Sequence, residues 1–189
     1  AVVERGSPNV YARWFQRWKP DLALVLGWYY LVPADARDLV SKGCIGIHAS
    51  LLPKYRGNAP IPWAIIRGEE ETGVSLFYLT DAVDAGDLIA QRSIPIRFED
   101  TCATVYQRAT DASIEILREM LPKLARDEAP RIPQREEDAF VVPARSPEDG
   151  RIDWDQDVRS VYDFIRAQTR PYPGAYSRFG ASRVTIWEA

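Results

Sequence analysis

The chain has 189 residues, of which 46% are hydrophobic, and a formal net charge of −3. This length accommodates one domain, or one domain and part of a second, with a substantial buried core. The acidic balance gives no sign of a nucleic-acid partner, because phosphate binding usually needs a basic face. The sequence has no apolar run long enough to span a membrane and no signal-peptide pattern, so we expect a cytoplasmic protein without membrane contact.

The two cysteines, Cys44 and Cys102, lack the close spacing of a metal site and are too few for a disulfide framework. Both lie among apolar residues, which predicts small buried side chains. Because the chain has a single histidine and scattered carboxylates, we expect no metal site.

The first half of the chain alternates predicted helices and strands. Ser7-Pro8 predicts the start of a helix that ends before Pro20, and the apolar run 22–26 predicts a strand buried on both faces. Pro33 opens a short helix, and residues 44–48 form the next predicted strand. This alternation predicts an α/β fold with a Rossmann-like, mostly parallel sheet flanked by helices. Ligands bind beyond the carboxyl ends of such strands, which is where His48 falls.

The middle of the chain continues with a predicted helix over 60–67 and predicted strands over 72–79 and 88–96. The turn 81–87 joins the two strands and brings Asp84 into a loop that can approach His48. A long helix is predicted from Asp100-Thr101 onward. Its apolar residues recur at helical spacing and are assigned to core packing: Val105, Ala109, Ala112, Ile116, Met120 and Leu124.

The composition changes at Glu128, where a proline-rich and charged connector with little core of its own begins. A helix over 158–169 and a hairpin of strands 176–179 and 183–187 follow. We therefore divide the chain into an α/β domain, residues 1–128, and a connector with the start of a smaller β-rich region, residues 129–189.

His48 and Asp84 are candidates for a paired acid–base site. Histidine changes its charge near neutral pH, and a nearby carboxylate would hold its tautomer and favour its charged form. The alternative is a histidine that caps a loop and an aspartate that belongs to a turn.

Several further motifs match one known family in order and spacing. They are His48 to Gly57 (His-Ala-Ser-Leu-Leu-Pro-Lys-Tyr-Arg-Gly), Ala59-Pro60, Trp63-Ala64-Ile65, Gly68-Glu69, Thr72-Gly73-Val74 and Val83-Asp84-Ala85-Gly86-Asp87. From about Asp21 to the C-terminus the chain resembles the folate-dependent formyltransferases, which include methionyl-tRNA formyltransferase and the N-formyltransferases of nucleotide-linked amino sugars. The family's opening strand–helix unit has no match here, so we expect the numbering to begin inside a longer polypeptide.

The resemblance implies transfer of a formyl group from N10-formyltetrahydrofolate, the cosubstrate, to a primary amine, with His48 and Asp84 as the catalytic residues. It implies that folate contacts Leu26, Gly27, Tyr30, Leu31, Leu51, Leu52, Asp81 and Val83, and that the acceptor contacts Tyr29, Ser50, Tyr55 and Arg56. Two alternatives stay open. Ser50 either offers its hydroxyl or caps the following turn, and the aromatic run 28–30 either stacks on a ring or packs in the core.

One departure from the family pattern is Gly46, which stands where an asparagine usually donates its carboxamide to the formyl oxygen. Three explanations of this glycine stay open. Another side chain replaces the donor, His48 and backbone amides suffice, or the protein binds folate with little turnover. For the acceptor, Tyr29-Tyr30 and the stretch 145–149 resemble an amino-sugar enzyme. We therefore expect an amino-sugar nucleotide as the partner, with initiator tRNA as the alternative, and a homodimer is compatible with the sequence.

Overall fold

The structure is a computed structural model that describes residues 9–28 and 30–189. Its elements follow in the order α1 (Asn9–Trp18), β1 (Ala23–Val25), α2 (Ala34–Arg37), β2 (Cys44–His48), β3 (Arg56–Gly57), α3 (Pro60–Ile66), β4 (Glu71–Tyr78), β5 (Leu88–Pro95), α4 (Cys102–Ala125), the 3₁₀ helix η1 (Glu136–Asp138), β6 (Val141–Val142), the 3₁₀ helix η2 (Pro147–Gly150), α5 (Val158–Gln168), β7 (Ala175–Phe179) and β8 (Ser182–Ile186). The predicted helix start at Ser7-Pro8 lies outside the described residues.

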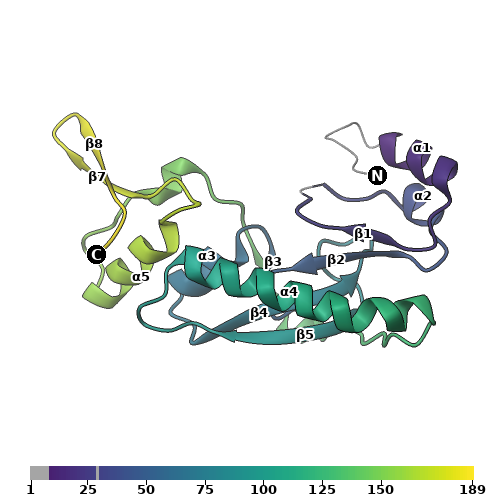
Figure 1. Cartoon of the computed structure of the whole chain (residues 1–189). Coiled ribbons are helices and arrows are strands. Elements are labelled where there is room, and N and C mark those ends of the chain that lie inside the picture. Colours follow the sequence, from purple (N-terminus) through teal and green to yellow (C-terminus); the bar gives the residue numbers. More distant parts are fainter. Residues whose placement is uncertain (1–8, 29) are drawn as a thin grey trace.

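The main sheet has the strand order β1-β2-β4-β5. β1 and β2 are parallel, whereas β4 is antiparallel to both β2 and β5. The predicted α/β fold with flanking helices and a small C-terminal β region is confirmed (Figure 1). The described sheet is more mixed than the expected mostly parallel one, because β4 and β5 are joined by the short turn 79–87. A short turn of this kind connects antiparallel strands, whereas parallel strands need a long crossover.

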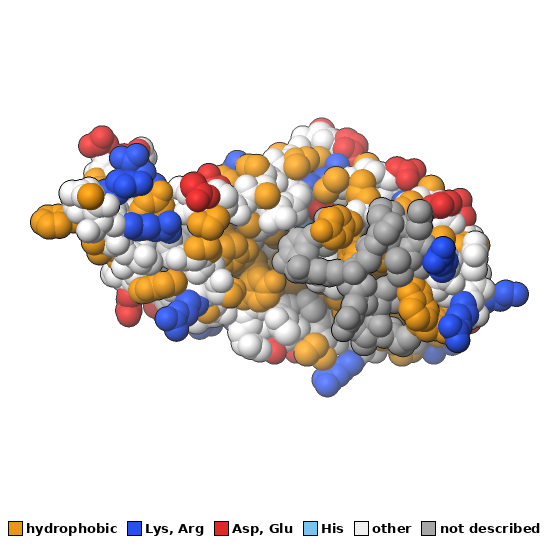
Figure 2. Space-filling view, turned by 90° about the horizontal axis from the view of Figure 1, so that it is seen from above, with side chains coloured by type: hydrophobic (Ala, Val, Ile, Leu, Met, Phe, Trp, Pro, Cys, Tyr) orange, Lys and Arg blue, Asp and Glu red, His pale blue; other side chains and the backbone are white. Residues whose placement is uncertain are grey.

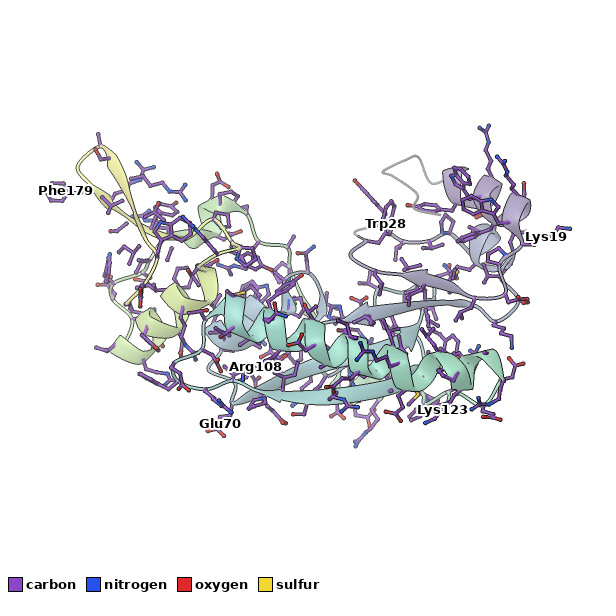
Figure 3. The ribbon with its side chains drawn as sticks, viewed as in Figure 1. Lys19, Trp28, Glu70, Arg108, Lys123 and Phe179 are labelled. Atoms are coloured by element: carbon purple, nitrogen blue, oxygen red, sulfur yellow. The ribbon has the colours of Figure 1, made fainter. Side chains whose placement is uncertain are left out.

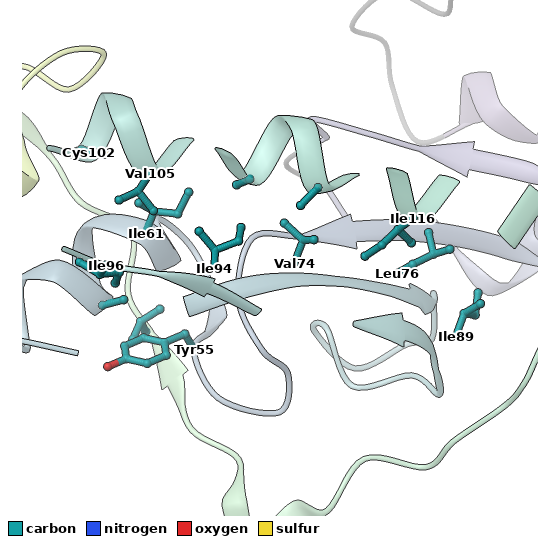
Figure 4. Close-up of a cluster of buried hydrophobic side chains, with 14 of the residues drawn as sticks. Tyr55, Ile61, Val74, Leu76, Ile89, Ile94, Ile96, Cys102, Val105 and Ile116 are labelled. Carbon is teal, nitrogen blue, oxygen red and sulfur yellow. The ribbon is translucent and has the colours of Figure 1, made fainter. Parts of the chain in front are cut away.

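One face of this sheet is covered by α4, as predicted. The apolar stripe of α4 is buried from Val105 to Leu124 and packs on Val74, Leu76 and Ile94 of β4 and β5 (Figure 4). Thr101 caps the helix by accepting a hydrogen bond from the Thr104 amide. Ile45 and Ile47 of β2 face α4. Because side chains alternate along a strand, the side chain of His48 belongs to the other face, and so would any Cβ at Gly46.

β1 differs from its prediction as a strand buried on both faces. Leu24 is 39% exposed and Leu26 is 50% exposed. The reason is that β1 is the edge strand of the described sheet, next to β2 alone.

The connector also packs more closely than its composition suggested. Ile132 pairs with Leu88 at the start of β5, and β6 pairs in parallel with β3. Val142 is 1% exposed within the main core. The backbone pairs with the sheet edge and with β3, so a proline-rich segment with few apolar residues is still held in place.

Beyond the connector, α5 lies against α3, and β7 and β8 form the predicted hairpin (Figure 1). Phe179 is 83% exposed at the turn of this hairpin and projects away from the rest of the chain (Figure 3). None of the helices in the described part of the chain combines the length and hydropathy that a bilayer span requires.

Candidate active site

His48 is the last residue of β2 and is 8% exposed. Its Nε2 lies 2.7 Å from the carbonyl oxygen of Tyr55, and its Nδ1 lies 3.5 Å from Oδ2 of Asp84. Both ring nitrogens therefore face acceptor oxygens. A neutral imidazole has only one N–H, so only the doubly protonated ring offers a donor to both oxygens.

Asp84 reaches His48 because the loop 80–87 folds back over the sheet after β4. Its backbone is in the left-handed region, with φ of 51°. Oδ2 of Asp84 accepts a hydrogen bond of 2.9 Å from the backbone N–H of Gly57. Gly57 itself has φ of 104°, and a Cβ there would overlap the carbonyl of Val142, so this donor position requires glycine. The predicted approach of Asp84 to His48 is thus present in the structure.

Ser50, a predicted acceptor contact, is fully buried. Its hydroxyl donates to the carbonyl of Lys54 at 2.6 Å, and its own carbonyl accepts from the hydroxyl of Ser75 at 2.7 Å. Of the two alternatives left open by the sequence, the structure favours the turn-capping role.

Tyr55 and Arg56, also predicted to contact the acceptor, have internal partners instead. Tyr55 is 4% exposed, and its phenol donates to Glu69 at 2.6 Å. Burial, together with that carboxylate, raises the pKa of Tyr55, so the phenol stays protonated. Arg56 is 6% exposed and makes a 2.7 Å ion pair with Glu136. These placements argue against direct acceptor contact by either side chain.

Two segments contain most of the predicted folate residues: 26–28 with 30–33, which we call the pre-α2 segment, and the loop 80–87. Apolar side chains in both are exposed, among them Leu26, Tyr30, Leu31 and Val83. Gly27 has φ of 60° and open space around its Cα. Tyr29 lies outside the described residues, so the acceptor contact predicted for it stays a prediction.

Arg37, a residue that the sequence motifs did not indicate, joins these two segments. Its guanidinium donates to the carbonyl of Val32 at the end of the pre-α2 segment and pairs with Asp81 at 2.7 Å. The link accounts for the position of Asp81, whose side chain is exposed but oriented toward α2.

Leu51 and Leu52 lie in the turn after His48 and differ from each other. The side chain of Leu52 is 3% exposed and packs on Phe77 and Leu88, so it is a core residue rather than a pocket wall. Its backbone N–H donates to Ser75, and its carbonyl accepts from Gln91. Leu51 is half-buried. Both the side chain of Leu52 and its backbone groups therefore have partners within the protein.

A cavity of about 510 Å³ borders the loop 80–87 from the side of α2. It is lined by Arg37, Tyr78, Thr80, Asp87 and Arg131, among others, and neither His48 nor Asp84 lines it. Cys44 reaches this cavity, but burial raises the pKa of its thiol to about 11. Burial raises the pKa of Cys102 to about 12. Neither thiol is therefore a nucleophile at neutral pH, and both are buried as predicted.

Gln134 is a second residue that no motif indicated. Its side chain lies against the backbone of the loop 80–87 and donates to the carbonyls of Asp84 and Gly86, each at 2.8 Å. It lies in the connector, where the proline-rich composition predicted only a loop. Among the described residues, no three His, Cys, Asp or Glu side chains gather as metal ligands would.

Comparison with known protein families matches two parts of the chain. The model described as formyl transferase matches residues 4–121, and the model described as formyl transferase, C-terminal domain, matches residues 145–189. The first match covers more than half of the 189 residues. The chain therefore belongs to the formyl transferase family, as its motifs predicted.

Solved structures agree with this assignment. HypX from Aquifex aeolicus in complex with tetrahydrofolic acid is 27% identical with a TM-score of 0.82, and the match covers 96% of this chain and 31% of that one. Methionyl-tRNA formyltransferase from Clostridium thermocellum is 25% identical with a TM-score of 0.72, and covers 95% of this chain and 87% of its own. A 4-N formyltransferase from Francisella tularensis is 22% identical with a TM-score of 0.82 over 98% and 75% of the two chains, which shows a shared fold alone. This chain spans about a third of the HypX chain that it matches.

Proposed function

We propose that this chain is a formyltransferase that moves a formyl group from N10-formyltetrahydrofolate to the primary amine of a nucleotide-linked amino sugar. The observation that carries the proposal is the contact of His48 with Asp84 at the end of β2. Family membership supports the reaction, and the similar HypX structure, which contains tetrahydrofolic acid, supports folate as the donor.

The two catalytic residues have complementary tasks in this reaction. The amine must lose a proton as its nitrogen bonds to the formyl carbon, and negative charge develops on the formyl oxygen. Oδ2 of Asp84 is held by Gly57, and we assign acceptance of the amine proton to Oδ1, which has no hydrogen-bond donor among the described residues. In its doubly protonated form, the ring of His48 carries a positive charge that stabilises the developing negative charge. N10 takes up a proton as its bond to the formyl carbon breaks.

The pre-α2 segment and the loop 80–87 suit a flat ring with polar edges. Tyr30 is 66% exposed and Leu31 is 55% exposed, so much of each side chain is accessible to a ligand. Such side chains, with loop backbone groups beside them, are the usual wall of a cofactor pocket. When bound there, N10-formyltetrahydrofolate supplies the formyl group. The chain's own contribution is to bind and orient it.

The choice of acceptor rests on charge and on the resemblance of residues 145–149 to an amino-sugar enzyme. The net charge of −3 favours a small acceptor over a polynucleotide. One observation favours the alternative, a methionyl-tRNA formyltransferase. Exposed Arg170, Arg178 and Arg183 lie on and beside the hairpin of β7 and β8, at the end of the molecule where Figure 2 shows Lys and Arg side chains.

Formyl transfer by the full gene product tests the proposal, with amino-sugar nucleotides and methionyl-tRNA offered in parallel. We expect selective turnover of one sugar nucleotide. The variant His48→Ala should lower kcat by about 100- to 1000-fold, the size of effect typical for loss of one group that stabilises the oxyanion. Its folate affinity should stay within about tenfold, because folate contacts lie in other segments.

The other outcomes are equally informative. Turnover of the tRNA alone would overturn the acceptor, and near-normal turnover in His48→Ala would overturn the catalytic role of His48. Folate binding without transfer to any amine would favour a folate-binding protein that lacks turnover, as the glycine at position 46 allows. Thermal unfolding of His48→Ala controls for loss of fold.

A further inference from the structure

The loop that carries Asp84 is held from two sides by groups outside it. On one side, the backbone N–H of Gly57 in β3 donates to the Asp84 carboxylate at 2.9 Å. On the other side, the Gln134 amide donates to the carbonyls of Asp84 and Gly86, at 2.8 Å each. The backbone at Asp84 is in the left-handed region, which an aspartate adopts at a cost and keeps only where its surroundings impose it.

The carboxamide of Gln134 has all its hydrogen-bonding capacity in use. Both amide hydrogens go to the loop carbonyls, and the amide oxygen accepts from Nε and Nη2 of Arg56 at 3.1 and 2.8 Å. Arg56 is in turn fixed by two hydrogen bonds to Glu136, of 3.0 and 2.7 Å. The orientation of the amide is therefore determined: its oxygen must face Arg56 and its nitrogen must face the loop.

The backbone of the connector determines where Gln134 lies. Ile132 exchanges hydrogen bonds with Leu88 at the end of the loop 80–87, at 2.8 and 3.0 Å. On the other side of Gln134, the amide of Arg56 donates to the carbonyl of Phe140 at 3.0 Å. The connector backbone is thus held on both sides of Gln134, and the Gln134 side chain links β3 to the loop that carries Asp84.

We propose that Gln134 is a positioning residue, which holds the loop 80–87 so that the Asp84 carboxylate stays beside the His48 ring. It acts through Asp84 and touches neither reacting group. Only the kinetic part of its test rests on the proposed function, because the geometry of the His48–Asp84 pair can be measured without turnover.

The direct test is the NMR chemical shifts of the His48 ring in the full chain. The sequence contains one histidine, and a His48→Ala spectrum identifies its signals. Asp84→Asn supplies the reference, because loss of the carboxylate changes the environment of the ring. We expect Gln134→Met to move the ring signals toward those of Asp84→Asn by a substantial part of that change. Gln134→Met leaves the charges of Arg56 and Glu136 in place. Gln107→Met, on the exposed side of α4, is the matched control and should leave the ring signals unchanged.

A second variant separates the two halves of the amide. Gln134→Glu still accepts from Arg56 but has no hydrogens for the two carbonyls. If Gln134 acts through the loop, both variants should lower kcat by about 10- to 100-fold with folate affinity within a few-fold, since small displacements of a reacting group have effects of this size. If it served only to hold Arg56, Gln134→Glu would behave as the wild type, and the proposal would be wrong.

Wild-type His48 ring signals in a folded Gln134→Met variant would likewise overturn the proposal. Should that variant fail to fold, Gln134→Asn takes its place, because the side chain shortened by one methylene withdraws the amide from the carbonyls. A wild-type protein without formyl transfer would contradict the proposed function, while the NMR spectra would still decide the role of Gln134.

Discussion

Gly46 illustrates how one residue shapes the environment of the site. A Cβ built at this position would lie 3.0 Å from Cδ2 of Leu79 and 3.4 Å from a ring carbon of Phe77. Phe77 is 3% exposed, whereas Leu79 is half-buried and can move. The space in which the family's asparagine would extend is therefore bounded by these two side chains in this chain.

We predict that Gly46→Asn lowers the free energy of unfolding by roughly 1–3 kcal/mol, because its carboxamide must displace the Phe77 ring. Gly46→Ala, which needs only a small shift of Leu79, should change it by less than about 1 kcal/mol. Urea unfolding of both variants measures the difference, and Gly46→Asn combined with Phe77→Leu should recover part of the loss. A Gly46→Asn variant with wild-type stability and higher turnover would instead mean that only the donor is missing.

The other predicted site residues differ in how far the sequence alone indicated their contacts. The pairing of His48 with Asp84 followed from motif positions, because both lie at chain reversals that the sequence marks with glycine and proline. The internal hydrogen bonds of Ser50, Tyr55 and Arg56 could not be predicted from the sequence. Their partners, Lys54, Glu69 and Glu136, come into contact with them only in the folded chain. A serine, a tyrosine or an arginine looks the same in sequence whether it faces solvent or a buried partner.

Among the elements, the start of α4 depends on a cluster of charges around Asp100. Its carboxylate accepts from the Arg97 amide at 2.7 Å and the Thr104 hydroxyl at 2.9 Å, and pairs with Arg108. Burial opposes ionisation of Asp100, but these hydrogen bonds, first among them the one from Arg108, lower its pKa. The folded state thus binds the Asp100 proton more weakly than the unfolded state does.

From this we predict that Asp100→Asn lowers the free energy of unfolding by about 2 kcal/mol at pH 7. A lowered pKa stabilises the fold above the ordinary aspartate value, near pH 4, and the effect is lost as the pH falls through the lowered pKa. The difference between wild type and variant should therefore shrink below about pH 4. Denaturant unfolding between pH 3 and pH 7 measures it, and a difference that does not change with pH would point to packing in place of charge.

For the whole molecule, Arg166 joins the C-terminal region to the α/β domain. It is 4% exposed, and its guanidinium donates to Asp163 at 2.6 Å and to the carbonyls of Arg97 and Asp100 at 3.0 and 2.7 Å. Asp163 also accepts from Arg159, whose side chain is 52% exposed. One buried cation therefore links α5 to the segment that precedes α4.

We predict that Arg166→Met lowers the free energy of unfolding by about 3 kcal/mol, since it leaves a buried carboxylate with a weaker partner and removes the guanidinium donor from two backbone carbonyls. Arg159→Met, which removes the exposed partner of the same carboxylate, should cost less than about 1 kcal/mol. Hydrogen exchange should show that β7 and β8 lose protection in Arg166→Met before α4 does. Equal effects of the two variants would mean that the buried link to Arg97 and Asp100 contributes little.

The sequence by itself determined the order and type of the main helices and strands and the two residues of the candidate pair, but not the short strands β3 and β6. Helical and strand periodicities, glycines and prolines are local properties, so the buried stripe of α4, the strand that ends at His48 and the C-terminal hairpin could be predicted. The tertiary structure decided the direction in which β4 joins the sheet, the exposure of β1 at its edge and the partners of the buried polar groups. It also placed Gln134 and Arg37 beside the loop that carries Asp84. These contacts join residues separated by tens of positions, and their free energy depends on burial and geometry that exist only in the folded chain.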